Sequence, residues 1–456
     1  MAQLNLNNCQ ISNSLLVKDV VVSNSLVFNN TKNNFGIGKN VLAKDTNDNY
    51  NTGVGNNTLS NNTTAYYNTG LGFNSLNSNT TGSYNTGLGT FSLTSNTTGS
   101  YNTGVGVSSL NSNISGGNNT GVGTFSLTSN TTGENNTGLG SFSLTTNTTG
   151  SSNTGIGLQS LNKNTTGSNN TGLGYKSLYS NTTGGNNTGL GYQSLYSNTT
   201  GSGNITVGTS SLYSNTSGYS NTGLGYQSLY NNTTGGNNTG LGYKSLYSNT
   251  TGSGNITVGT SSLTSNTTGS NNTAIGNNAL INNTTFNNVT GLGANSVVTG
   301  NDQVQLGDVS SNVYTQSAVN TRSDLRDKTD IRDTILGLDF INKLRPVDFR
   351  WDMREDYVEY VVNGDANNDS KSSITVIQKP KDGSKKRDRF HHGLIAQEVK
   401  STMDNLNVDF AGYQDHKING GKDVLTIGYE ELIGPLIKSI QELTAEVAFL
   451  KSQLQK

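Results

Sequence analysis

A serine and a lysine five positions apart, Ser323 and Lys328, are the residues of this chain whose types best suit covalent chemistry. A serine hydroxyl becomes an effective nucleophile when a base takes its proton, and a lysine amine serves as that base once burial or nearby cations lower its pKa. The same spacing also suits a helix start, with Ser323 as N-cap and Asp324 and Asp327 near the helix dipole. Because serine and lysine are common residues, this pair alone favours a capped helix over a catalytic pair.

The pair lies in the first of four sequence blocks, at 323–331, 344–351, 392–399 and 429–443. The second reads Leu-Arg-Pro-Val-Asp-Phe-Arg-Trp and the third His-Gly-Leu-Ile-Ala-Gln-Glu-Val. In content and order the blocks resemble the signatures of the peptidase S74 family. This family is the intramolecular chaperone at the C-terminus of phage tailspikes, endosialidases and other viral fibres. The resemblance covers residues 322–456 and implies an α+β chaperone domain.

The resemblance also implies a function, namely that the attached fibre trimerises and the chaperone then cleaves itself off. In this sequence the nucleophile would be Ser323, the base Lys328 and the cleaved bond Arg322–Ser323. Folding and assembly would supply the burial that activates the lysine, so cleavage would wait for correct assembly. His392 and Gln397 belong to the third block, and the resemblance marks them as supporting residues. The alternative for both is a purely structural, hydrogen-bonded role.

The last residues have the pattern of a coiled coil. Apolar residues recur at alternating spacings of three and four from Ile433 to Leu454, which predicts one helix over 433–454. Ile or Val alternating with Leu by itself favours two strands, whereas the family resemblance implies three. We adopt three, because a short coil attached to a large assembly does not choose its own number.

An array of 17-residue repeats precedes this domain in the sequence. The unit, Asn-Thr-Gly-Leu-Gly-x-x-Ser-Leu-x-x-Asn-Thr-Thr-Gly-x-x, begins at every seventeenth residue from Asn34 to Val289, in 16 copies. Such a period is typical of a solenoid, whose units bury their apolar faces by stacking. The array resembles the β-roll heads of trimeric bacterial adhesins and the collar-like repeats of viral fibres. At a strand spacing of roughly 4.8 Å it predicts a rod on the order of 75 Å long.

Two positions of the unit stay apolar. The fourth position is aliphatic from Ile37 to Leu292, and the ninth is aliphatic from Leu42 to Val297. We expect both columns to face inward, with the glycines at the corners of each coil. The predicted fold class is mainly β, a trimeric β-solenoid or β-roll shaft followed by an α+β chaperone domain with a C-terminal coiled coil.

The predicted domains follow from these patterns. Residues 1–33 are an attachment or shaft-start segment whose apolar run at 15–22 suggests β-structure. Residues 34–307 are the repeat shaft, 308–322 the linker to the cleavage site, and 323–456 the chaperone with autoprotease activity.

Tyrosines gather at the sixth and tenth positions of the middle copies. Stacked rings that stiffen the rod are one interpretation, and a stripe that binds a sugar or receptor is the other. The residues are Tyr175, Tyr179, Tyr192, Tyr196, Tyr213, Tyr226, Tyr230, Tyr243 and Tyr247.

Composition excludes several other classes of protein. A net charge of −1 gives no basic footprint for nucleic acid. Glu134 is the only glutamate of the array, whereas a polysaccharide-cleaving tailspike needs paired carboxylates. A single cysteine, Cys9, permits no intramolecular disulfide, and no metal site or cofactor is predicted. The sequence has neither a signal peptide pattern nor a membrane-spanning apolar run, so we expect neither Sec export nor membrane insertion.

The Asn-Thr-Thr triplets of the array satisfy the N-glycosylation rule, but a buried or laddered asparagine explains them equally.

The predicted function is that of a homotrimeric viral or phage fibre, located in the virion, which assembles with itself and then cleaves at Arg322–Ser323. A host-surface glycan or receptor is the further partner considered. The alternative is an uncleaved trimeric adhesin or carbohydrate-binding fibre that keeps its C-terminal domain as a permanent clamp.

Overall fold

The computed structural model describes residues 26–29, 33–46, 49–308, 311, 313, 316, 323–363, 373–417 and 423–455. The chain forms two compact units, Met1–Val313 and Tyr314–Lys456, so the boundary between them lies within the predicted linker 308–322. The apolar run at 15–22 and Cys9 lie outside the described residues, as does most of that linker.

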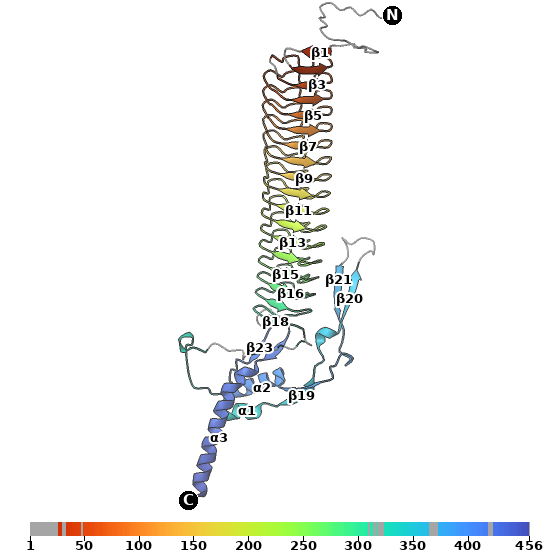
Figure 1. Ribbon diagram of the computed structural model, residues 1–456. Coiled ribbons are helices and arrows are strands. Elements are labelled where there is room, and N and C mark those ends of the chain that lie inside the picture. The colour runs from red at the N-terminus through yellow and green to blue at the C-terminus, as the bar shows by residue number, and fades with distance from the viewer. Residues whose placement is uncertain are drawn as a thin grey trace, which may run out of the picture. The chain divides into compact units, whose positions relative to one another are not determined.

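The first unit is a parallel β-solenoid in which each 17-residue repeat makes one coil and contributes one short strand (Figure 1). Neighbouring strands pair one repeat apart, as Thr171 pairs with Thr188. At the N-terminal end β1 (Leu26–Asn29) pairs antiparallel with β2. The prediction of a mainly β solenoid followed by an α+β region is confirmed. The remaining strands of this sheet are β2 (Asn34–Ile37), β3 (Thr52–Val54), β4 (Thr69–Leu71), β5 (Thr86–Leu88), β6 (Thr103–Val105), β7 (Thr120–Val122), β8 (Thr137–Leu139), β9 (Thr154–Ile156), β10 (Thr171–Leu173), β11 (Thr188–Leu190), β12 (Ile205–Val207), β13 (Thr222–Leu224), β14 (Thr239–Leu241), β15 (Ile256–Val258), β16 (Thr273–Ile275), β17 (Thr290–Leu292) and β18 (Val304–Leu306).

The last coil is shorter than the sequence period predicts. Thr290 of β17 pairs with Val304 of β18, a step of 14 residues instead of 17. In this coil Val298 is buried and Val297 is only half-buried. The sixteenth repeat therefore closes the array early, although its sequence starts like the others.

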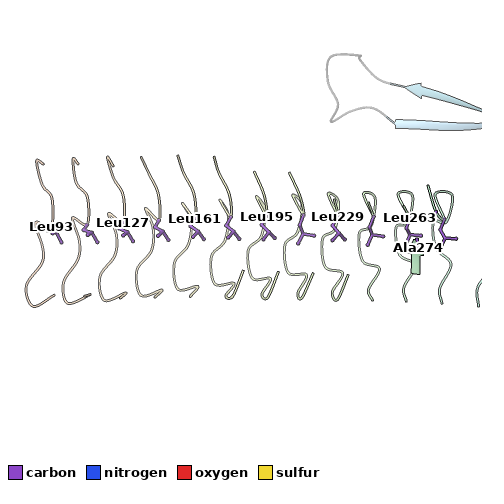
Figure 2. Packing of buried hydrophobic residues seen from close by; sticks show 14 of the residues in the cluster. Leu93, Leu127, Leu161, Leu195, Leu229, Leu263 and Ala274 are labelled. Carbon is purple, nitrogen blue, oxygen red and sulfur yellow. The ribbon is translucent and has the colours of Figure 1, made fainter. Parts of the chain in front are cut away.

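The two apolar columns do not both face inward. The ninth-position leucines are buried from Leu59 to Leu280, and Figure 2 shows them as one row of side chains, one per coil. The fourth-position column lies on the outside, where Leu173 is 41% exposed and no member is buried. The prediction for the fourth position was wrong because side chains alternate along a strand. In each Thr-Gly-Leu strand the central glycine faces inward, so both neighbours face outward.

Polar side chains fill the rest of the interior of each coil, because the fourth-position column lies outside it. Serines of the eighth position and asparagines of the first and twelfth are fully buried beside the leucines, as Ser177, Asn170 and Asn181 illustrate. A narrow coil with glycine at its third and fifteenth positions leaves room for small polar groups. It has no room for a second aliphatic layer.

The buried asparagines form two hydrogen-bonded ladders along the array. At the twelfth position, Asn181 Nδ2 donates to Asn164 Oδ1 of the preceding coil at 2.8 Å and to Gly184 O of its own coil at 2.9 Å. At the first position, Asn170 Oδ1 accepts from the backbone N–H of Asn187 at 3.0 Å. Buried amides need partners, so each coil is locked to its neighbours in a single register. The twelfth-position asparagines are those of the Asn-Thr-Thr triplets, and their burial favours the ladder over glycosylation.

Tight backbone turns close each coil. The glycine at the fifth position has a left-handed backbone, with φ +134° at Gly191, and a Cβ there would lie 2.6 Å from the carbonyl oxygen of Gly208. The buried leucine is also left-handed, with φ 53° at Leu195. This costs a leucine about 1–2 kcal/mol, which its burial at about 1.5–3 kcal/mol offsets.

The second unit is a small α+β assembly. Its sheets are two-stranded: β19 (Val347–Arg350) with β22 (Phe390–Gly393), β20 (Val358–Asn363) with β21 (Ser373–Gln378), and β23 (Tyr413–Asp415) with β24 (Leu425–Ile427). Its helices are α1 (Leu338–Lys343), α2 (Ala396–Leu406) and α3 (Ile433–Leu454), with single 3-10 turns η1 (Leu325–Asp327), η2 (Arg354–Asp356) and η4 (Tyr429–Leu432). The predicted C-terminal helix is confirmed with the expected bounds.

The core of this unit is small. Phe340 of α1, Val399 and Met403 of α2, Leu336 and Phe410 are its buried members. Across the described ranges, no helix is both long and apolar enough to cross a lipid bilayer.

We predict that Asn181→Leu destabilises the coils around it by about 2–4 kcal/mol, because buried Asn164 Oδ1 loses its donor and the amide of Asn198 loses one of its two acceptors. Hydrogen exchange of amides in the flanking coils measures this locally, as a repeat array requires.

Asn231→Leu is the matched control. Asn231 is half-buried at the eleventh position, no side-chain hydrogen bond is described for it, and we expect a change within about 0.5 kcal/mol. Equal effects of the two substitutions would contradict the role given to the ladder.

Candidate functional site

Ser323 and Lys328 lie side by side. The single turn η1 carries the chain back on itself, and the backbone N–H of Lys328 donates to Leu325 O at its end. The ammonium Nζ of Lys328 then donates to Ser323 Oγ at 2.6 Å. The structure therefore places the predicted nucleophile and the predicted base in direct hydrogen-bond contact.

The cap of this turn is Asp324, not Ser323. The Asp324 carboxylate accepts from the backbone N–H of Arg326 at 2.9 Å and pairs with Arg326 Nη2 at 2.6 Å. Hydrogen bonds from Arg326 hold the pKa of Asp324 below its ordinary value. The interpretation of Ser323 as the cap is therefore wrong, because Asp324 caps the turn. The serine hydroxyl instead accepts a hydrogen bond from Lys328.

The pair is open to solvent within the single chain. Ser323 and Lys328 are both exposed, and so are the apolar side chains of Leu325, Ile331 and Ile335, each more than 60% exposed. Arg322, on the other side of the predicted cleaved bond, lies outside the described residues.

His392 is tied to a partner that the sequence did not identify. In the register of β19 and β22 it faces Asp348, and its Nδ1 lies 2.6 Å from Asp348 Oδ1. Both side chains are mostly exposed. Asp348 and His392 belong to the second and third blocks, which was the only sequence feature that could have linked them. Only the pairing of β19 with β22 shows that they meet.

Gln397 lies exposed at the start of α2. Among the described residues, no hydrogen bond or ion pair joins it or His392 to Ser323 or Lys328. The structure thus brings together the serine and the lysine but not the predicted supporting pair.

The later blocks are held to one another by polar contacts. Arg345 Nε of the second block donates to Glu398 Oε2 of the third at 2.9 Å, and this contact holds the pKa of Glu398 below its ordinary value. The backbone N–H of Leu394 donates to the Tyr429 hydroxyl of the fourth block at 2.9 Å. The blocks distant in sequence therefore form one structural unit.

The fourth block also anchors α3 to the helix that follows the first block. Glu442 of α3 accepts from the backbone N–H of Leu338, at the start of α1, at 2.7 Å.

The tyrosines of the array form stacks. At the tenth position, five rings from Tyr179 to Tyr247 stack at centroid distances of 5.0–5.2 Å, and burial raises the pKa of Tyr213 and Tyr230. Lys163 and Lys244 lie over the two end rings. The sixth position has two separate pairs, Tyr175 with Tyr192 and Tyr226 with Tyr243. Neighbouring rings cover the flat faces that a sugar would stack on, which supports the stiffening role, while glycan or receptor binding stays a prediction.

No curated protein and no solved structure matches this chain. A family model matches one region of it. The family match begins at Ser323 itself and spans the first three blocks, ending before α3. Residues 323–407 match the model of the peptidase S74 family, described as the chaperone of endosialidase.

Proposed function

We propose that this chain is a homotrimeric fibre protein of a virus or phage particle, whose C-terminal unit assembles three chains and then cleaves itself off before Ser323. An S74 chaperone domain after a β-solenoid suggests a protein of the fibre or tailspike kind. The observation that carries the finer proposal is the 2.6 Å contact between Lys328 Nζ and Ser323 Oγ at the first residue of the family match.

The proposed reaction uses only groups of the chain and one water. The Ser323 hydroxyl adds to the carbonyl carbon of Arg322 while the neutral Lys328 amine takes its proton. The C–N bond then breaks as the Ser323 nitrogen accepts a proton, which leaves Arg322 as an ester on the serine oxygen. Water hydrolyses the ester and releases the array with a free carboxylate at Arg322.

Exposure of the site supports assembly before cleavage. A solvated ammonium has no free lone pair with which to accept the serine proton. Covering the segment that carries Leu325, Ile331 and Ile335 removes water and favours the neutral amine. Docking of neighbouring chains is the event that supplies this cover.

Helix α3 gives a reason for copies to associate. Its predicted seam is exposed along its length, from Ile433 at 58% through Ile440 at 64% to Leu450 at 53%. A row of apolar side chains with 3,4 spacing is buried when several such helices pack side by side. We therefore propose a trimeric coiled coil over 433–454.

We predict that Ser323→Ala abolishes cleavage, so that intact-mass spectrometry finds only the full-length chain. The wild type should give two products that separate at Arg322–Ser323.

Ser311→Ala is the control, since Ser311 lies before the site and bonds to Asp308 instead of a lysine. It should cleave like the wild type. A full-length wild-type chain in a well-formed trimer would overturn the cleavage proposal and favour the uncleaved adhesin.

We predict that Ile440→Lys weakens the trimer, because it places a charge in the seam. Gln441→Lys, one residue away and off the seam, adds the same charge and should leave the trimer intact. Sedimentation velocity over a concentration series compares the two variants. Trimers of equal stability would contradict the proposed coil.

A further inference from the structure

The outer face of the solenoid sheet carries a continuous apolar strip. It consists of the fourth-position column from Ile37 to Leu292, together with the second-position residues that share this face of each strand. Leu71, Leu224 and Ile275 are each more than 40% exposed. The second position is threonine in most copies and isoleucine at Ile205 and Ile256, which are also exposed.

An exposed apolar strip is unusual on the face of a parallel sheet. Parallel sheets are normally covered on both faces, because both faces are apolar. The interior of the coils covers only one face here. In none of the 16 copies does a charged residue occupy the second or fourth position, although charged residues stand elsewhere in the repeat. The strip therefore has the composition of a buried surface.

We infer that this strip packs against the same strip of two other copies of the chain, around the axis of a trimeric shaft. The inference rests on the proposed function, which brings three chains together, and adds the surface through which the shafts meet.

The shape of the strip identifies the partner. One aliphatic residue recurs per coil, so the strip has the axial spacing of strands, roughly 4.8 Å, over a length of about 75 Å. A second copy of the array presents the same residues at the same spacing, and a compact globular partner does not.

The area is also sufficient. A strip about 75 Å long and about 10 Å wide offers about 750 Å² per chain, which each chain divides between its two neighbours, so the three strips together bury about 2,250 Å², compared with about 1,200–2,000 Å² in total for a stable two-partner interface. The fifth-position glycines, which follow the aliphatic residue directly, add no side chains to hold the chains apart.

Cysteine cross-linking in the full-length chain tests this packing. In a Cys9→Ser background, Leu190→Cys places a thiol on the strip and Thr200→Cys places one at an exposed fourteenth position of the same coil. A disulfide forms only where two Cα atoms approach within about 7 Å. Three thiols around one axis permit one disulfide, so Leu190→Cys should link two chains of each trimer under mild oxidation, and Thr200→Cys should link none.

Denaturing gel electrophoresis of the oxidised protein reports both the cross-link and the cleavage, so it distinguishes failure of this inference from failure of the proposed function. Chains linked at position 190 but uncut at Arg322–Ser323 would support the strip and defeat self-cleavage. Cut chains without a link at position 190, or with equal linking at both positions, would overturn the strip and leave self-cleavage standing.

A charge-insertion pair gives a second measurement. The combined change Leu173→Lys, Leu190→Lys and Val207→Lys puts three charges on the strip. Its control, Thr183→Lys, Thr200→Lys and Ser217→Lys, puts three on exposed positions of the same coils. Native mass spectrometry should show loss of the trimeric array only in the first variant, and a trimeric array in both would overturn the inference.

Discussion

The hydrogen-bonding demand of buried asparagine determines the structure of the array. From Asn51 to Asn283 each coil encloses two asparagine side chains, whose hydrogen-bond partners lie in a neighbouring coil or across their own turn. Because unpaired buried amides are costly, a coil that shifts along the stack loses all of its bonds to the neighbouring coils together. The leucine row fills the remaining space. Register within one chain is thereby fixed by polar contacts more than by the apolar core.

Register between chains has no such lock. If three arrays pack through their aliphatic strips, sliding one by a whole coil brings the same residue types together again and costs contacts only at the ends. A separate domain that aligns the three chains before their shafts pack together would prevent such slipped registers. In the proposed trimer this role falls to the region of the family match, residues 323–407, and to α3, which follow the array in the sequence. The proposed cleavage after assembly would then make the aligned state irreversible, because the aligning unit leaves.

The sequence could predict what depends on spacing. The 17-residue period gave the solenoid, and the 3,4 pattern gave α3 with its bounds. It failed at the fourth position, since an aliphatic column looks the same whether it faces its own core or another chain, and the small polar residues that fill this core carry no hydrophobic signal. The Ser323–Lys328 contact follows from a single local turn and was within reach. The Asp348–His392 contact depends on pairing between strands 44 residues apart, which no local pattern reveals.

Native mass spectrometry of the freshly refolded wild-type chain, followed over time, tests the central claim most directly. If assembly activates the site, full-length trimers appear first, and the released C-terminal unit then arises from them at a rate independent of further dilution. Released unit appearing from monomers before any trimer forms, or trimers that never release it, would contradict the account.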